Sequence, residues 1–256
     1  MYSSEEREKT RAALIQGAEQ DSRIIGAAHL GSAAVDRLDA WSDIDIALCI
    51  SSDAVMKDVV SDWTRHLYDQ HDAITHCDVR RGETLYRVFL LRNTLQIDVS
   101  FWPAQNFRAV GPKFKLVFGT PNQAQTAALA NPFELIGMAW LYGLHVRSSV
   151  ARGRLLQAEY MLGAMRNQVL ALACLRSEVP TSDGRGFDNL AESYRSDILQ
   201  CYPSQIDARE LCLAFGRLTI MLLSEIRAVD THLADAIAPT LTEIVAACTA
   251  TASSID

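Results

Sequence analysis

The segment 24–50 reads IIGAAHLGSAAVDRLDAWSDIDIALCI, and it decides how the chain is organised. An apolar run, 24–30, ends at Gly31-Ser32, and a stretch of alternating polarity begins at Asp43. In that second stretch the isoleucine and leucine side chains share one face, while Asp43 and Asp45 share the other, which is the period-two pattern of a β-strand. We therefore predict two strands, joined by a turn and a short helix that Gly31-Ser32 opens.

Asp43 and Asp45 are two residues apart on this expected strand, so their side chains point the same way. Their Cβ atoms would lie about 6.5 Å apart. At an effective dielectric constant of about 20, two such charges repel by about 2.5 kcal/mol. A divalent cation turns this repulsion into attraction, and magnesium prefers oxygen ligands. A solvent-exposed strand edge is the alternative explanation of the pair.

A third carboxylate, Asp98, occupies a similar position in the later segment Leu95-Gln96-Ile97-Asp98-Val99-Ser100-Phe101. Its apolar residues share one face, and Asp98 shares the other face with Ser100. If this strand lies beside the strand that begins at Asp43, the three carboxylates come together. Three carboxylates can hold two metal ions about 3.5–4 Å apart, which suits in-line phosphoryl displacement.

Gly31-Ser32 adds a candidate phosphate-binding turn. Glycine lets backbone N–H groups approach a phosphate closely. The Ser32 hydroxyl can donate a further hydrogen bond, and the amino terminus of a helix favours negative charge.

The rest of the chain predicts an α+β protein in two parts. Residues 1–120 are expected to form a small mixed domain of helices and strands, and residues 121–256 a helical domain. Thr120-Pro121-Asn122 is expected to link them. The expected helices and strands of the first part are helices 4–20 and 53–70 and strands 24–30, 43–50, 73–79, 85–91 and 94–101, with Asn93-Thr94 as a turn. Those of the second part are helices from Pro132, 155–175, 205–228 and 233–250.

Composition narrows the possible partners. The net charge is -7 and the pI about 5.4, so a general nucleic-acid-binding role is disfavoured. The chain has no 18-residue apolar run and no signal-peptide pattern at its start, so we expect no membrane partner and a cytoplasmic location. The six cysteines are scattered without a C-x-x-C pair, which favours reduced, buried thiols.

Gly31-Ser32 together with Trp41-Ser42-Asp43-Ile44-Asp45 resembles the signature of the DNA polymerase β-like nucleotidyltransferases. In that signature, Gly-Ser and a spacer precede Asp-hydrophobic-Asp, and a third Asp lies on a later strand, as Asp98 does here. The motif spans residues 24 to 101. The mixed domain followed by a helical domain is similar to the antibiotic nucleotidyltransferases that modify aminoglycosides and lincosamides.

The resemblance implies a polymerase β-like fold, in which a mixed sheet flanked by helices is followed by an α-helical bundle domain. It also implies an enzyme that uses two Mg²⁺ ions held by Asp43, Asp45 and Asp98. It would move a nucleoside monophosphate, AMP from ATP, to a hydroxyl of a small molecule and release pyrophosphate. The alternative is the same chemistry on a protein or an RNA, as in toxin–antitoxin members of the superfamily. A non-catalytic nucleotide sensor is a third class, disfavoured because all three carboxylates are present.

Further residues have both a functional and an ordinary interpretation. Arg108, Lys113 and Lys115 follow the Asp98 strand and can neutralise a triphosphate, or they are simply surface cations. On the expected helix 155–175, Arg166 can reach a phosphate, Tyr160 can stack on a base and Glu159 can act as a base. The ordinary interpretation of these three is a solvated helix face with one core tyrosine. His29 and Trp102 are more typical of packed residues than of catalytic ones.

Overall fold

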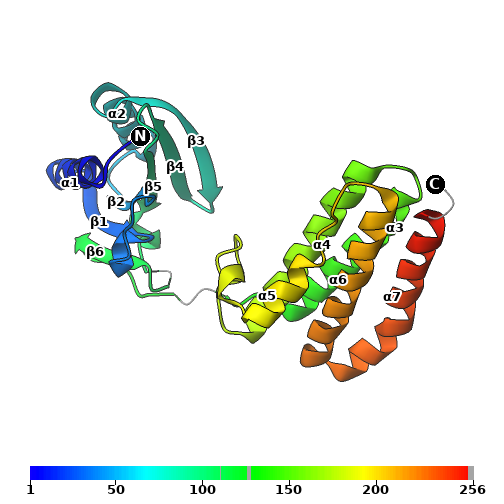
Figure 1. Cartoon of the computed structure of the whole chain (residues 1–256). Coiled ribbons are helices and arrows are strands. Elements are labelled where there is room, and N and C mark those ends of the chain that lie inside the picture. Colours follow the sequence, from blue (N-terminus) through cyan, green and yellow to red (C-terminus); the bar gives the residue numbers. More distant parts are fainter. Residues whose placement is uncertain (110, 126–127, 253–256) are drawn as a thin grey trace. The chain divides into compact units, whose positions relative to one another are not determined.

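The structure, a computed structural model, describes residues 1–109, 111–125 and 128–252. The chain divides into two compact units, Met1–Ala127 and Ala128–Asp256 (Figure 1). The first is built on a sheet and the second entirely from helices, so the expected α+β class is confirmed.

The first unit contains a six-stranded sheet in the order β3-β4-β5-β2-β1-β6 (Figure 1). Its strands are β1 (Ile24–Leu30), β2 (Ile44–Ile50), β3 (Ala73–Arg81), β4 (Thr84–Leu91), β5 (Gln96–Pro103) and β6 (Phe114–Phe118). β2 and β5 run parallel, and the other neighbouring pairs are antiparallel, so the sheet is mixed as expected. β6 was not expected from the sequence, and it extends the sheet beyond β1.

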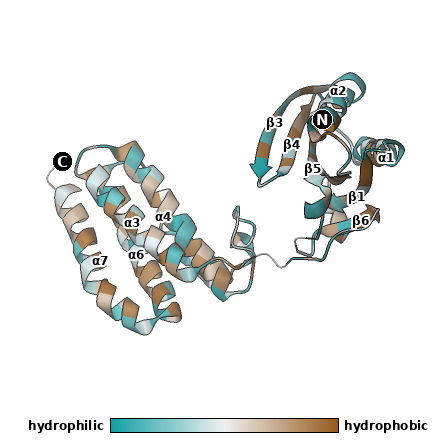
Figure 2. Cartoon of the chain, turned by 180° about the vertical axis from the view of Figure 1, so that it is seen from behind, coloured by the Kyte–Doolittle hydropathy of each residue, from teal (hydrophilic) through white to brown (hydrophobic). Residues whose placement is uncertain are grey.

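Two helices, α1 (Ser4–Gln20) and α2 (Met56–Gln70), pack on the apolar face of this sheet. Leu14 of α1 and Trp63 of α2 join the isoleucines of β2 in one buried cluster. Figure 2 shows the contrast between α1, mostly hydrophilic in colour, and the hydrophobic strand β1. Only a narrow stripe of α1 is buried, which is what a surface helix on a sheet requires.

Alternation along β2 and β5 sends the remaining side chains to the opposite face. A smaller core there contains Ala47, Cys49, Trp102 and Phe107. This face also carries Asp45 and Asp98, because both alternate with the isoleucines that α1 and α2 cover. The sheet therefore separates its apolar helix-covered side from the side that bears the carboxylates.

The segment expected to link the two parts belongs to the first unit. Asn122 pairs with Arg108 in an isolated bridge, and its side-chain amide donates to the carbonyls of Ala104 and Phe107. The Asn122 backbone N–H also donates to the Phe107 carbonyl. These bonds extend the first unit beyond residue 120, whereas the sequence suggested only a composition change there.

The second unit is a helical bundle with one continuous core (Figure 1). Its helices are α3 (Pro132–Val150), α4 (Leu155–Arg176), α5 (Glu192–Leu199), α6 (Ala208–Val229) and α7 (Thr231–Ala252). α3 packs against α4, α6 and α7, and α6 also packs against α4 and α7. Asn131 caps α3 by accepting from Phe133 N, with Pro132 in the first turn, as predicted. α5 was not predicted.

One expectation about the last helices is corrected. Cys212 of α6 and Cys248 of α7 form a disulfide, so not all cysteines are free thiols. Their sequence separation gave no C-x-x-C signal, and only helix packing brings them together. α7 is long and apolar enough, by length and composition, to cross a membrane. In the bundle its Leu241 and Ile244 are buried in the core.

Candidate functional site

The carboxylates at the centre of the predicted site lie on neighbouring strands. β2 and β5 pair in parallel, and the register places Asp45 directly beside Asp98. Residues that pair across two strands present their side chains on the same face. The expectation that the Asp98 strand lies beside the Asp45 strand is therefore confirmed.

Asp98 is half-buried, and its Oδ1 atom is buried without a hydrogen-bond partner among the described residues. Burial, and then the negative charge of Asp43, raise the pKa of Asp98 to about 6. Both causes make the charged form unfavourable in the protein as it stands. A bound cation would offset both the burial of the Asp98 charge and its repulsion by Asp43. This position is therefore suited to a positively charged ligand.

Asp43 lies just before β2, which begins at Ile44, and not on the strand itself as expected. Its Oδ2 accepts a hydrogen bond from Gln96 Nε2 at 3.2 Å, so the start of β5 holds it. The electrostatic influence of Asp43 on Asp98 shows that the two carboxylates share one region. Gln96 is a contact that the sequence analysis missed, because only the strand pairing reveals it.

Gly31 lies against the Asp45 carboxylate. Its φ is 58°, a left-handed conformation that glycine adopts without strain. A Cβ atom at this position would lie 2.0 Å from Asp45 Oδ2. The absence of a side chain therefore lets the main chain of the turn approach the carboxylate.

Ser32 begins a single 3₁₀ turn, Ala33–Val35, where the sequence predicted a turn leading into a short helix. The Ser32 side chain does not cap this turn. The Ser32 backbone carbonyl accepts hydrogen bonds from the backbone N–H groups of Val35 and Arg37. Asp36 ends the turn in a left-handed conformation with φ 52°. So short a helix contributes little dipole, so the prediction of a phosphate-binding turn depends mainly on the Gly31 main chain and the Ser32 hydroxyl.

No group of three or more His, Cys, Asp and Glu side chains in the described ranges is gathered closely enough to enclose a metal ion. Magnesium, however, usually takes one or two carboxylates and completes its shell with water and substrate phosphates. The aligned Asp45 and Asp98, with an unpartnered buried oxygen on Asp98, fit such an open site. Asp43 is the next carboxylate along.

Two aromatic residues, Tyr86 and Trp102, lie on the same face of the sheet as Asp98. Tyr86 of β4 is half-buried, and its pKa is raised by burial and by the charge of Asp98. Trp102 is buried between the Tyr86 and Phe107 rings, and its Nε1 donates to Ser100 Oγ at 2.8 Å. Trp102 therefore fills the core, the interpretation that the sequence slightly favoured.

The sequence analysis expected three cations near the triphosphate, Arg108, Lys113 and Lys115. Arg108 donates to the Asn106 carbonyl, among other acceptors of its own loop. Lys115 of β6 contacts Asp36 at 3.0 Å and pairs in register with His29. Burial, and then the positive charges of Arg11 and Lys115, lower the pKa of His29. Lys113 is exposed.

In the helical unit, the three residues singled out on α4 differ in exposure. Tyr160 is 70% exposed, and Glu159 is partly exposed. Arg166 is 4% exposed, with its guanidinium 3.7 Å above the Tyr202 ring and a hydrogen bond to the Cys201 carbonyl. Arg166 is therefore part of the bundle's interior and not of a solvated helix face.

Comparison with known proteins gave structural matches only. No family model matches the chain, and no curated protein matches it. An aminoglycoside 6-adenyltransferase from Bacillus subtilis aligns with a TM-score of 0.41 and 12% identity, covering 90% of this chain and 95% of that one. A nucleotidyltransferase-like protein from Exiguobacterium sibiricum aligns with a TM-score of 0.37 and 12% identity, covering 89% and 78%. What the site can do follows from its own residues.

Proposed function

We propose that this protein is a magnesium-dependent nucleotidyltransferase that moves AMP from ATP to a hydroxyl group of a small molecule. The observation that carries the proposal is the pairing of Asp45 with Asp98, with the Gly31 main chain against Asp45. A fold gains nothing structural from placing two carboxylates side by side. The pair is explained by a ligand that supplies positive charge.

Asp45 and Asp98, with Asp43 beside them, would hold the magnesium. When bound, magnesium neutralises the triphosphate and favours ionisation of the acceptor hydroxyl. The chain's own contribution is to orient the substrates. Gly31 leaves room for a phosphate near Asp45, and the Ser32 hydroxyl can donate to it.

In the reaction, the acceptor oxygen forms a bond to the α-phosphorus of ATP. The bond between that phosphorus and the oxygen bridging to the β-phosphate breaks, and pyrophosphate leaves with that oxygen. The acceptor hydroxyl loses its proton. Asp98, the half-buried carboxylate of the pair, would be the base that accepts it.

The class of acceptor is inferred from the net charge of the protein. With a net charge of -7, the protein attracts a cationic compound more than a polyanion. An aminosugar carries several amines and hydroxyls, so an aminoglycoside is the first acceptor to test, followed by a lincosamide. Arg108, Lys113, Lys115, Tyr160 and Arg166 stay predictions as nucleotide-binding residues.

The test is to incubate purified protein with magnesium, labelled ATP and a panel of such compounds. Mass spectrometry should find one acceptor heavier by one AMP unit, together with released pyrophosphate. The Asp45→Asn protein is the control for a contaminating enzyme. Label that appears only on protein or on tRNA, in parallel reactions with a lysate and with total tRNA, would replace the small-molecule acceptor by a macromolecular one.

A further inference from the structure

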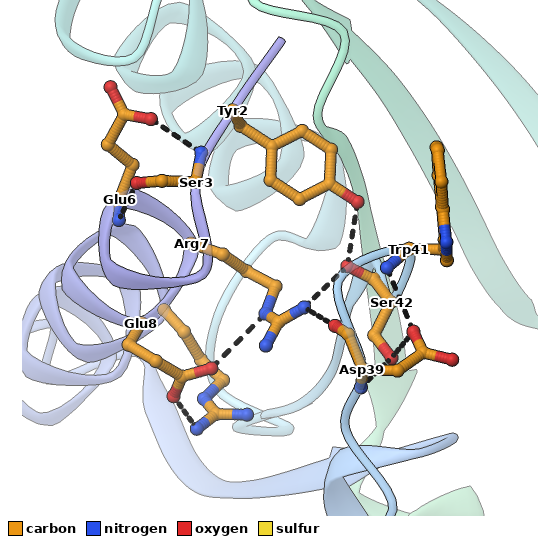
Figure 3. Close-up of polar contacts among 9 residues, drawn as sticks. Tyr2, Ser3, Glu6, Arg7, Glu8, Asp39, Trp41 and Ser42 are labelled. Carbon is orange, nitrogen blue, oxygen red and sulfur yellow. Dashed lines mark hydrogen bonds and ion pairs between the residues drawn. The ribbon is translucent and has the colours of Figure 1, made fainter.

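The backbone turn that delivers Asp43 to the site is held from within by Asp39. The Asp39 carboxylate accepts from the Trp41 backbone N–H at 2.9 Å and from Ser42 Oγ at 2.9 Å (Figure 3). Ser42 Oγ in turn accepts from the Asp39 backbone N–H at 3.0 Å. These bonds, led by that of the Ser42 hydroxyl, lower the pKa of Asp39, so the carboxylate stays charged near neutral pH.

Arg7 of α1 holds the same turn from outside, although more than 30 residues separate them in the sequence. Its Nη1 donates to the Asp39 carbonyl and, at 3.2 Å, to the Ser42 carbonyl (Figure 3). Tyr2 adds a second donor, because its hydroxyl lies 3.0 Å from the Ser42 carbonyl. The amino-terminal segment therefore places two hydrogen-bond donors on one carbonyl.

The burial of Arg7 shows that its contact with the turn is an integral part of the fold. Arg7 is 3% exposed, whereas its neighbour Glu8, which accepts from Arg7 Nε at 3.2 Å, is partly exposed. Burying a guanidinium is unfavourable unless its donors are satisfied. Two of the acceptors are main-chain carbonyls of the turn, so the turn and the buried cation stabilise each other.

The Ser42 carbonyl is part of the peptide group that joins Ser42 to Asp43. A peptide group is planar, so fixing its oxygen restricts the orientation of the N–H and Cα of the next residue. Loops move more than the elements they connect, and a binding constellation needs its groups held within about 0.5 Å. A turn held at this carbonyl carries Asp43 in a restricted position.

We propose that Arg7, assisted by Tyr2, is a positioning residue that holds the turn Asp39–Ser42 and thereby orients Asp43 for the divalent cation. This inference rests on the proposed nucleotidyltransferase function, since it assigns Asp43 a cation to bind. Arg7 itself touches neither the substrate nor the cation. Its effect passes through the main chain of the turn.

The variants are Arg7→Met, Arg7→Lys and Tyr2→Phe, and the control is Arg11→Met. Arg11 lies one turn further along α1 and pairs with Glu8, so its loss tests helix charge without touching the turn. Tyr2→Phe removes one donor and leaves the ring in place, which keeps the test valid if Arg7→Met does not fold. Circular dichroism and thermal unfolding establish which variants are folded.

Two properties are measured. The first is the affinity for Mn²⁺ with a non-hydrolysable ATP analogue, followed by electron paramagnetic resonance. The second is the ¹⁹F spectrum of protein containing 5-fluorotryptophan, in which Trp41 is assigned with Trp41→Phe. Trp41 is 80% exposed within the turn, so its resonance reports the order of the turn.

We expect Arg7→Met to bind Mn²⁺ about tenfold more weakly, which is the scale of one hydrogen bond from a charged group. Tyr2→Phe should bind it several-fold more weakly, which is the scale of one hydrogen bond between neutral groups. The Trp41 resonance should narrow in both, and Arg7→Lys should recover part of the affinity. Parent-like Mn²⁺ affinity and spectrum in the folded variants would overturn the positioning role alone. Parent-like affinity in Asp45→Asn would overturn the proposed function, and the positioning role with it.

Discussion

Asp98 in the sheet and Glu225 in the helical bundle are both carboxylates withdrawn from water, and their surroundings differ. Glu225 is 2% exposed, and Arg176 binds both of its oxygens, at 2.8 Å and 3.0 Å. Asp98 has a buried oxygen with no partner in the described part of the chain, and the carboxylates of Asp43 and Asp45 are its neighbours.

The difference separates a structural charge from a functional one. A buried carboxylate whose hydrogen bonds are satisfied by the protein serves the fold. One left unsatisfied beside a like charge lowers the stability of the fold, and such groups cluster at sites that bind ligands. The two carboxylates should therefore respond in opposite ways to neutral substitution, in both stability and activity.

The largest effect should be on activity. Asp45→Asn and Asp98→Asn should each reduce AMP transfer about a thousandfold, because a bound metal contributes several kcal/mol of charge stabilisation. Chelation of magnesium should do the same to the parent. Asp53→Asn, an exposed carboxylate just after β2, is the matched control. Turnover rates with radiolabelled ATP measure all four. Parent-like rates in both site variants would remove the metal from the proposal.

The next effect concerns the paired carboxylate. Glu225→Ala should lower the free energy of unfolding by about 3 kcal/mol, because Arg176 loses its partner and a cavity opens in the bundle. Glu243→Ala, at an exposed position on α7, should change stability little. Urea denaturation followed by circular dichroism measures both. The comparison fails if Glu225→Ala is as stable as its control.

Asp98→Asn should instead raise the free energy of unfolding of the metal-free protein. The folded-state pKa of Asp98, about 6, lies above the ordinary aspartate value of 3.8, so the folded protein is relatively most stable below pH 3.8 and loses that advantage as the pH rises to about 6. Above pH 6 the charge on Asp98 destabilises the fold in full. Asparagine removes this cost. Because solvent screens the partly exposed Asp98, the variant should exceed the parent by about 2 kcal/mol at pH 7.5, less than the full pKa shift implies.

The pH dependence of this difference in stability gives the more specific test of the prediction. The stability difference between Asp98→Asn and the parent should shrink as the pH falls from 6 toward 4, where Asp98 is increasingly protonated. Urea denaturation in the presence of a chelator, at several pH values, measures it. A variant less stable than the parent at pH 7.5 would show that the Asp98 charge is satisfied in the fold.

The alternation of Asp45 and Asp98 with apolar neighbours was enough to predict which face they occupy. Their adjacency depended on β2 pairing with β5 in parallel, a choice that local pattern leaves open and the whole sheet decides. The contact of Arg7 with Ser42 and the disulfide of Cys212 with Cys248 link distant segments, so no spacing in the sequence reveals them.

Ten residues between Gly31-Ser32 and Asp43 suggested a short helix, and the chain forms a single 3₁₀ turn instead. The left-handed Asp36 and the bonds around Asp39 use the remaining residues for an irregular turn. Asp and Ser side chains compete for backbone groups in this way and favour turns over helices. The composition of the spacer thus decided its structure more than its length.

Gly31→Ala tests the approach of the turn to Asp45, and Gly82→Ala is its matched control. Both glycines have φ near 58°, but a Cβ at Gly82 meets nothing within 4 Å. Each variant should lose about 1 kcal/mol of stability through backbone strain. Only Gly31→Ala should also lose ATP affinity, because its Cβ displaces the Asp45 carboxylate. Equal ATP affinity in the two variants, by calorimetry, would place the phosphate elsewhere.

The smallest expected effect is that of Ser32→Ala. The Ser32 side chain does not cap the 3₁₀ turn, so its loss should leave the free energy of unfolding nearly unchanged. If its hydroxyl donates to a phosphate, the variant should bind ATP more weakly by about 1 kcal/mol, the scale of one hydrogen bond. Inorganic triphosphate should show the same loss, because the missing donor faces a phosphate and not the base. Calorimetric titration with both ligands measures this, and Ser3→Ala, which removes the cap of α1, should instead lower stability without affecting ATP binding. An unchanged affinity for both ligands in Ser32→Ala would leave Gly31 as the part of the turn that serves the phosphate, through its main chain alone.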